Sequence, residues 1–310
     1  MRIGIVGLGL IGGSLALSLR RAESRAQQGS AHATSNQSAR RIEILGVDTN
    51  SRSLASAKRS GAIDLAAHPS RAPFVSCDLI VLCTPTPALL ESLPGIAAQM
   101  HAAALLTDVC GVKELPTALG AAQKQIVFVG AHPMAGREER GFTAARADLF
   151  DEACVALCPA VGIASGNRAW SSAALEAVRA LWSEAGATRF LTLTPREHDR
   201  AVAYASHLPA LAAASVFAAL EQAGASSRIA RALAAGGFRD TTRLAADGTV
   251  GQAAVHNRFL PEVLRRVATS LNAFAAQIED GLHSNDLAPL ARDLEQLADR
   301  RRSMRLPPRR

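Results

Sequence analysis

Six residues near the N-terminus, Gly7-Leu8-Gly9-Leu10-Ile11-Gly12, constrain the fold of this 310-residue chain more than any other feature. They follow an apolar run and precede a helical pattern, which is the setting of a G-x-G-x-x-G turn in a βαβ unit. The first glycine permits the tight turn, the second lets the backbone approach a pyrophosphate, and the third lets strand and helix pack closely. The start of the helix offers free N–H groups to phosphates. The motif therefore predicts a dinucleotide site that includes Gly7, Gly9, Leu10, Ile11 and Gly12.

Short apolar runs alternate with helical patterns through the first half of the chain. Runs that are apolar without alternation are typical of strands in a parallel sheet covered on both faces. Predicted strands span residues 2–7, 42–47, 79–84, 104–108 and 126–131, and residues 154–158 are also interpreted as a strand. Predicted helices span residues 12–20, 51–60, 88–101 and 113–122. We therefore expect an α/β fold whose N-terminal domain, residues 1–158, is a Rossmann-type doubly wound parallel sheet.

Asp48 ends the second predicted strand, where an acidic side chain can accept hydrogen bonds from the adenosine ribose hydroxyls. It follows Gly12 by 36 residues rather than the usual ~20, and a polar insertion over residues 22–39 accounts for the excess. The negative charge of Asp48 favours NAD over NADP, although Arg52 nearby leaves NADP open. Thr84 and Pro85 end the third predicted strand, so we expect them to line the same cofactor.

The second half of the chain changes character after about Pro159, where predicted strands stop. Apolar residues then recur every three or four positions, which predicts amphipathic helices. One such stripe consists of Leu260, Val263, Leu264, Val267, Leu271, Phe274 and Ile278, and a second of Leu287, Leu290, Leu294 and Leu297. Residues 201–220 are almost wholly apolar and predict a buried helix. We expect an all-helical second domain over residues 159–300, and its apolar surface favours a homodimer.

The net charge of +7 does not indicate a nucleic-acid partner, because six arginines within residues 300–310 account for most of it. We interpret residues 301–310 as a basic tail that forms a solvated chain end. Aromatic residues make up 4% of the chain, too few for base-stacking platforms. No run of ~18 uninterrupted apolar residues predicts a membrane span. The five cysteines form no C-x-x-C pair, so neither a disulfide framework nor a metal site is predicted, and we expect a cytoplasmic protein.

Three polar segments stand out on the substrate side. They are Thr107-Asp108-Val109-Cys110-Gly111-Val112-Lys113, the His132-Pro133-Met134-Ala135-Gly136 segment that runs on to Phe150, and Gly237-Phe238-Arg239-Asp240-Thr241-Thr242-Arg243-Leu244-Ala245. With the glycine motif, they make the chain resemble the prephenate/arogenate dehydrogenases of tyrosine biosynthesis from the glycine motif to about residue 275. The resemblance implies NAD-dependent oxidative decarboxylation of prephenate to 4-hydroxyphenylpyruvate, in a dimer.

The resemblance also implies roles for individual residues. His132 would accept the proton of the substrate hydroxyl, for which a neutral histidine is suited near pH 7. Arg243 would bind a substrate carboxylate, because a guanidinium forms two parallel hydrogen bonds with it. Glu138 and His207 would belong to the catalytic pocket. Asp108 and Lys113 would lie in the loop near the nicotinamide, Asp108 on the cofactor side.

Two substrate-side positions depart from the pattern of the resembling family, and the tryptophan that the family carries after the arginine segment also has no match, since Gly251 stands near its place. Gly111 stands where many members have a serine, and Ala210 stands where many have a second histidine after His207. These departures leave arogenate open as the substrate, and also an enzyme that accepts both compounds. Two further alternatives are a dehydrogenase of the β-hydroxyacid type and a non-catalytic NAD-binding regulator.

Overall fold

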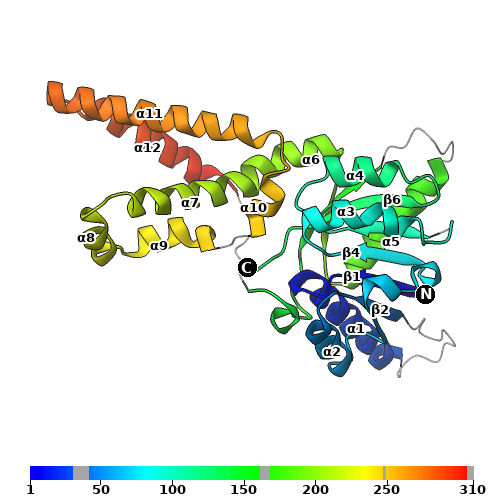
Figure 1. Cartoon of the computed structure of the whole chain (residues 1–310). Coiled ribbons are helices and arrows are strands. Elements are labelled where there is room, and N and C mark those ends of the chain that lie inside the picture. Colours follow the sequence, from blue (N-terminus) through cyan, green and yellow to red (C-terminus); the bar gives the residue numbers. More distant parts are fainter. Residues whose placement is uncertain (31–41, 103, 138, 161–167, 247–248, 306–310) are drawn as a thin grey trace. The chain divides into compact units, whose positions relative to one another are not determined.

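The computed structural model describes residues 1–30, 42–102, 104–137, 139–160, 168–246 and 249–305 (Figure 1). Within these residues one eight-stranded sheet has the order β3-β2-β1-β4-β5-β6-β7-β8. Its strands are β1 (Arg2–Val6), β2 (Glu43–Val47), β3 (Leu65–Ala67), β4 (Leu79–Leu82), β5 (Leu105–Asp108), β6 (Val127–Pro133), β7 (Cys154–Pro159) and β8 (Arg189–Thr192). All neighbouring strands are parallel except β6 and β7. The predicted doubly wound sheet is confirmed.

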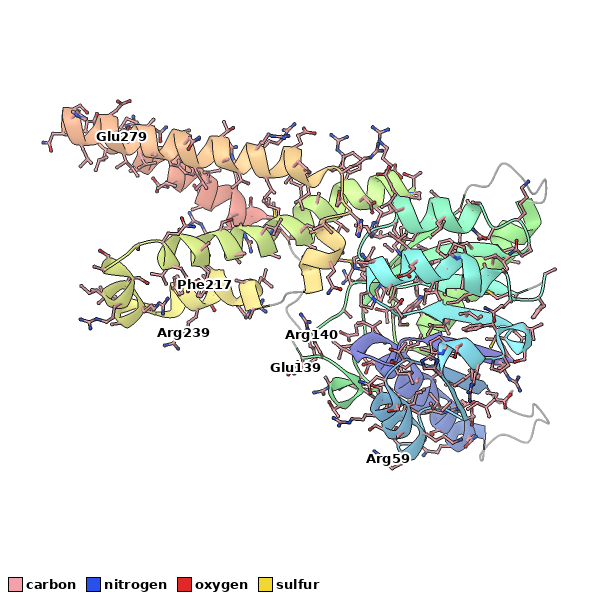
Figure 2. The ribbon with its side chains drawn as sticks, viewed as in Figure 1. Arg59, Glu139, Arg140, Phe217, Arg239 and Glu279 are labelled. Atoms are coloured by element: carbon pink, nitrogen blue, oxygen red, sulfur yellow. The ribbon has the colours of Figure 1, made fainter. Side chains whose placement is uncertain are left out.

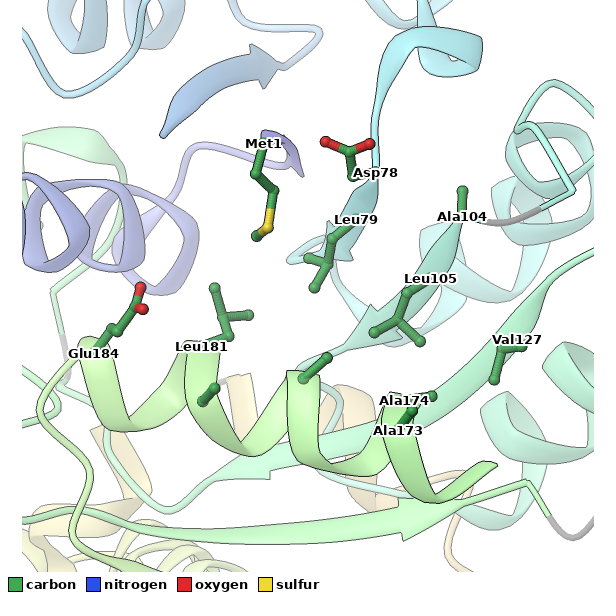
Figure 3. Close-up of a pocket in the computed structure, with 12 residues that line it drawn as sticks. Met1, Asp78, Leu79, Ala104, Leu105, Val127, Ala173, Ala174, Leu181 and Glu184 are labelled. Carbon is green, nitrogen blue, oxygen red and sulfur yellow. The ribbon is translucent and has the colours of Figure 1, made fainter. Parts of the chain in front are cut away.

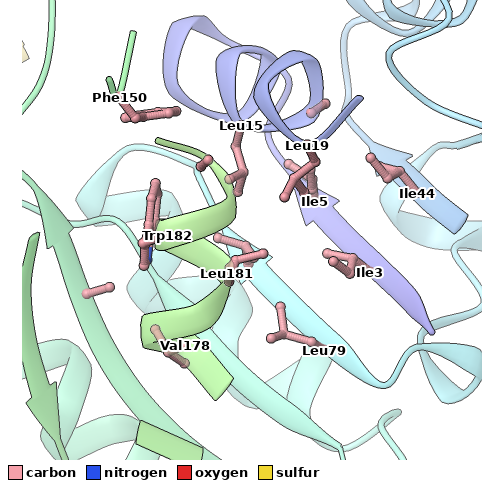
Figure 4. Packing of buried hydrophobic residues seen from close by; sticks show 14 of the residues in the cluster. Ile3, Ile5, Leu15, Leu19, Ile44, Leu79, Phe150, Val178, Leu181 and Trp182 are labelled. Carbon is pink, nitrogen blue, oxygen red and sulfur yellow. The ribbon is translucent and has the colours of Figure 1, made fainter. Parts of the chain in front are cut away.

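Helices connect the strands and cover both faces of the sheet. The described helices here are α1 (Leu10–Ser30), α2 (Ser51–Arg59), α3 (Thr86–Ala97), α4 (Glu114–Ala121) and α5 (Arg168–Glu184), with short 3-10 turns η1 (Pro69–Arg71), η2 (Phe74–Ser76) and η3 (Phe142–Ala144). On one face Leu15 and Leu19 of α1 and Trp182 of α5 pack with Ile3 and Ile5 of β1 (Figure 4). A second cluster, with Leu89, Leu93 and Ile96 of α3, covers the other face. This burial on both faces explains why the central strands are apolar without alternation.

The helical half begins after β8. It contains α6 (Pro195–Val202), a five-residue π turn η4 (Ala203–His207), α7 (Leu208–Glu221), α8 (Ser226–Leu233), α9 (Gly236–Thr242), the 3-10 turn η5 (Arg243–Ala246) and α10 (Thr249–Ala254). α7 contacts α9 and η5. The chain divides into two compact units, Met1–Arg258 and Phe259–Arg310, and the second unit consists of α11 (Leu260–Ser284) packed on α12 (Ala288–Ser303). The helical nature of this half is confirmed.

Four expectations differ from the structure. Strands do not stop at Pro159, because β8 extends the sheet beyond residue 158, the predicted end of the first domain. The predicted insertion over residues 22–39 is helical in its first part, since α1 continues to Ser30, and residues 31–39 lie outside the described residues. Residues 301–303 of the predicted tail belong to α12. The expected burial of residues 201–220 is wrong for α7, where only Ala210 and Ala213 are buried.

Helix α7 exposes apolar side chains on the surface of the single chain. Val216 and Phe217 remain 41% and 42% exposed within one chain, and Phe217 lies along this helix in Figure 2. The helical run of residues 195–221 is long and apolar enough to cross a bilayer by length and composition, and 28% of its most apolar 18-residue stretch is buried. That criterion is weak by itself, because core helices of water-soluble proteins meet it as well.

Candidate active site

The glycine-rich turn has the shape that phosphate binding requires. Gly7 has a φ of +93°, and its N–H donates to the carbonyl of Val47 at 2.7 Å. A Cβ on Gly12 would lie 2.0 Å from the carbonyl oxygen of Gly7, so no other residue fits at this point. A Cβ on Gly9 would meet nothing within 4 Å. The turn is therefore closed toward the protein at Gly7 and Gly12 and open at Gly9, where a pyrophosphate can approach the backbone.

Other cofactor candidates surround the same end of the sheet. The Asp48 carboxylate accepts a hydrogen bond from the N–H of Leu8 at 2.6 Å, which ties the end of β2 to the glycine turn. Thr84 follows β4, and its buried hydroxyl has no hydrogen-bond partner among the described residues. Pro85 precedes α3, and Leu10 and Ile11 open α1 with partly exposed side chains. An orphaned hydroxyl beside an open glycine turn fits a dinucleotide that supplies the missing partner.

Asp108, the last residue of β5, and Lys113, just before α4, form a buried ion pair. Lys113 Nζ donates to Asp108 Oδ2 at 2.6 Å and to the carbonyl of Ala131 at 2.7 Å, and both charged side chains are fully buried. Asp108 Oδ1 accepts from the N–H of Ala131, and Oδ2 also accepts from the N–H of Cys110, each at 3.1 Å. The pair thereby clamps the backbone next to His132. This geometry gives both residues a supporting position beneath the site.

His132 occupies the last part of β6, beyond the stretch that pairs with β5. Antiparallel pairing with β7 lets β6 continue past the end of its parallel neighbour, so His132 lies at the edge of the sheet where α/β folds bind ligands. Burial, followed by the charges of His198, Lys113 and His207, lowers the pKa of His132 well below 6.5. The imidazole is therefore neutral near pH 7, as a proton acceptor must be.

A second histidine, His198, contacts His132, and it was not predicted from the sequence. His198 Nε2 lies 2.9 Å from His132 Nδ1, and the two rings meet edge to face with centroids 5.1 Å apart. His198 Nδ1 lies 2.8 Å from Asp199 Oδ1. Asp199 also accepts the N–H of Lys113 at 2.6 Å and the N–H of Glu114 at 2.9 Å, so it holds the start of α4. The one signal available in the sequence was the adjacent pair His198-Asp199 in the charged segment that forms α6.

His207 lies at the end of the π turn η4 and is buried. Burial lowers its pKa, so this ring is also neutral near pH 7. Asn257 Nδ2 lies 3.1 Å from His207 Nδ1 and donates to the carbonyl of Asp199 at 2.7 Å. Because that amide nitrogen is a donor, His207 Nδ1 accepts and Nε2 carries the proton. His207 is thereby prepared to donate a hydrogen bond. Asn257 is a further residue that the sequence did not reveal.

The two departures from the family pattern lie close to these histidines. A Cβ on Gly111 would be 3.9 Å from Nε2 and Cε1 of His132 and 3.0 Å from the Cβ of Ala253 in α10. The ring nitrogen that does not face His198 thus faces Gly111. Ala210 is buried in the first turn of α7, one turn after His207. Burial raises the pKa of the neighbouring Cys110 to about 12, so this thiol is not a nucleophile.

The remaining predicted site residues are Arg243 and Glu138. Arg243 begins η5 after α9 and is exposed. Glu138 lies outside the described residues. A cavity of about 370 Å³ lies elsewhere, between α5 and residues at the starts of β4, β5 and β6, and none of the predicted site residues line it (Figure 3). Ligands of such sheets bind at the opposite, carboxyl ends of the strands, so the region of His132, and not this cavity, is the candidate active site.

Comparison with known proteins gives a consistent result. A family model described as prephenate dehydrogenase, nucleotide-binding domain, matches residues 31–191, and one described as prephenate dehydrogenase, dimerization domain, matches residues 194–296. The prephenate dehydrogenase of Bacillus subtilis (strain 168) is 30% identical over 244 residues, which are 78% of this chain and 59% of that protein. The chain spans 59–61% of the length of the first two curated relatives that it matches.

Two solved structures resemble this one over nearly the whole chain. Arogenate dehydrogenase from Synechocystis superposes with a TM-score of 0.69 at 28% identity, covering 97% of this chain and 99% of that one. Prephenate dehydrogenase from A. aeolicus, in complex with hydroxyphenyl propionate and NAD+, superposes with a TM-score of 0.78 at 24% identity, covering 97% of each chain. The second likeness shows the fold alone.

Proposed function

The chain belongs to the prephenate dehydrogenase family, and from that premise we propose that it catalyses the NAD-dependent oxidative decarboxylation of prephenate to 4-hydroxyphenylpyruvate. The products would be 4-hydroxyphenylpyruvate, CO2 and NADH. One observation carries the proposal: a buried, neutral histidine, His132, lies at the ligand-binding edge of the sheet, with Nδ1 held by the side chain of His198 and Nε2 on the side of Gly111.

The open glycine turn, Asp48 and the orphaned Thr84 hydroxyl would hold the dinucleotide, together with Leu10, Ile11 and Pro85. NAD+, when bound, supplies the hydride acceptor for this chemistry. The Asp48 carboxylate favours NAD, because its negative charge repels the 2′-phosphate of NADP. The backbone N–H groups at the start of α1 would face the pyrophosphate, where the helix terminus favours negative charge.

His132 would accept the proton of the C4 hydroxyl of the substrate through Nε2. As the C4–H bond breaks with loss of hydride, the O–H proton would pass to His132 and a ketone would form at C4. The C1–carboxylate bond would then break to release CO2, its electron pair would enter the ring, and the C4 oxygen would take a proton back from His132, which gives the phenol of the aromatic product. A positioned base of this kind contributes ~10²–10⁴-fold to the rate.

Other residues of this chain would bind and hold the reactants. Arg243 would pair with a substrate carboxylate, and Glu138 would border the pocket. His207 would donate a hydrogen bond from Nε2 to the substrate. Asp108 and Lys113, which clamp the backbone beside His132, would keep the base in register with the cofactor.

Arogenate is the second candidate substrate, favoured by two particular observations. A structural neighbour at 28% identity is an arogenate dehydrogenase. Ala210 also stands where many family members have a histidine, so no imidazole at this position would oppose the ammonium group that arogenate carries in place of the keto group of prephenate. An enzyme that oxidises both compounds is the intermediate outcome.

A homodimer and a cytoplasmic location complete the proposal. The exposed apolar residues of α7, with Val216 and Phe217 among them, fit a second copy of the chain, and residues 194–296 match a dimerization domain. The five cysteines are free thiols, which is usual in a reducing compartment.

The test is to mix the purified chain with NAD+ and either prephenate or arogenate and to follow NADH by absorbance. His132→Asn should lower kcat by ~10²–10⁴-fold and leave the Kd for NAD+ unchanged. His283→Asn, which changes an exposed histidine near the end of α11, is the matched control. Turnover by neither substrate, with NAD+ bound normally, would favour the non-catalytic regulator instead.

A separate variant tests the carboxylate site. Arg243→Gln should raise KM much more than it lowers kcat, because a substrate carboxylate loses its charged partner. Arg228→Gln, which changes an exposed arginine of α8, is the control. If Arg243→Gln weakened only NAD+ binding, Arg243 would belong to the cofactor site.

A further inference from the structure

The side chains of His132, His198 and Asp199 form a continuous hydrogen-bonded chain that begins at Nδ1 of His132. His132 Nδ1 and His198 Nε2 are 2.9 Å apart, and His198 Nδ1 and Asp199 Oδ1 are 2.8 Å apart. His198 and Asp199 are each 1% exposed, so water does not compete for these contacts. Among the described residues, this is the one side-chain hydrogen bond that the ring of His132 makes.

The protons in this chain can be placed from the Asp199 end. Asp199 Oδ1 accepts the N–H of Lys113, and Oδ2 accepts the N–H of Glu114. Both oxygens are therefore acceptors, and the contact with His198 requires a proton on His198 Nδ1. A neutral imidazole carries one proton, so His198 Nε2 holds a lone pair. It must then accept from His132 Nδ1, which leaves His132 Nε2 unprotonated.

We propose that Asp199 and His198 are positioning residues that fix the tautomer of His132, so that Nε2 is the proton acceptor. The inference rests on the proposed function, since it explains how that base is prepared. It also explains how the site works with Gly111 in place of a side chain that could orient the ring. The orientation comes from α6 instead.

The surroundings are consistent with a neutral chain in the resting enzyme. Burial lowers the pKa of both His132 and His198. The charges that act on the two rings are the Lys113 ammonium, which opposes protonation, and the Asp108 and Asp199 carboxylates, which favour it at His198. When Nε2 takes the substrate proton, His132 becomes positively charged, and its Nδ1–H donates to His198, which in turn donates to the Asp199 carboxylate. In serine proteases a carboxylate stabilises the imidazolium by direct contact with Nδ1–H, and here His198 relays that interaction.

The direct test reads the tautomer without substrate. The full chain is labelled with 15N in histidine only, and the ring nitrogens are observed by NMR at pH 7.5, with His132→Asn identifying the His132 signals. We expect a protonated Nδ1 and an unprotonated Nε2 on His132. A protonated Nε2 would overturn the proposal even if the enzyme turned over prephenate, so this result is separable from the proposed function.

Kinetic variants test whether the tautomer matters. His198→Gln keeps a carbonyl oxygen that can accept from His132 Nδ1–H, whereas His198→Leu keeps the size but removes the acceptor. We expect His198→Leu to lower kcat by ~10²-fold or more, with KM and the Kd for NAD+ unchanged, and His198→Gln to recover most of the loss. Equal losses in the two variants would indicate a packing role and contradict the proposal. If His198→Leu fails to fold, the comparison of wild type with His198→Gln and the NMR result still decide.

Discussion

The buried ion pair of Lys113 and Asp108 allows a quantitative prediction. Lys113→Met keeps the length of the side chain but removes the ammonium, so the Asp108 carboxylate remains fully buried with only two backbone N–H donors, from Cys110 and Ala131. The carbonyl of Ala131 loses its donor as well. Removing one partner of a buried ion pair costs about 3–5 kcal/mol, so we expect the free energy of unfolding to fall by that amount.

The assay is urea unfolding followed by the fluorescence of the two tryptophans, of which Trp182 is buried in the same core as the sheet. Lys113→Met with Asp108→Asn should lose less than Lys113→Met alone, because no uncompensated charge remains. Arg231→Met, which breaks the exposed pair with Glu221, should change stability by less than ~1 kcal/mol. A loss below ~1 kcal/mol for Lys113→Met would show that the pair is accessible to water and would refute the reasoning.

Two further predictions concern the cofactor turn and the histidines. Gly12→Ala should abolish measurable NAD+ binding in calorimetry, since its Cβ would lie 2.0 Å from the carbonyl of Gly7, and unchanged affinity would contradict the assigned turn. His132, His198 and His207 have pKa values lowered from 6.5, so below pH 6.5 the unfolded chain binds protons that the folded chain does not. Stability should therefore fall between pH 6.5 and 5.5 by up to about 1 kcal/mol per histidine, and an unchanged urea midpoint over this range would exclude buried neutral rings.

The central sheet could be predicted from the sequence because its strands are buried on both faces and carry unbroken apolar runs. β8 could not, since Arg189 lies in an edge strand with mostly exposed side chains that give no such run. The far end of α1 was missed for a related reason. Residues 22–30 have no apolar period, and Ala, Glu, Arg and Gln extend the helix by propensity alone.

The candidate site was predictable only in part. His132 and His207 were found through local segments that resemble a known family. His198 lies 66 residues from His132 along the chain, and contact at that separation is set by how α6 packs on β7 and α4 rather than by any local pattern. Lys113 and Asp108 are only five residues apart, but the burial of their pair against the backbone of Ala131 in β6 depends on the three-dimensional fold, and their assignment to the site stays a prediction.

The position of Asp199 also limits how such proteins can be recombined. The base His132 belongs to the first half of the chain, while the pair that orients it lies in α6, just after the point between residues 191 and 194 where one family model ends and the other begins. A hybrid joined there would inherit its base from one parent and the orientation of that base from the other. A crossover placed after Asp199 keeps His132, His198, Asp199 and the start of α4 from a single parent. We expect the hybrids that remain active to be of this kind.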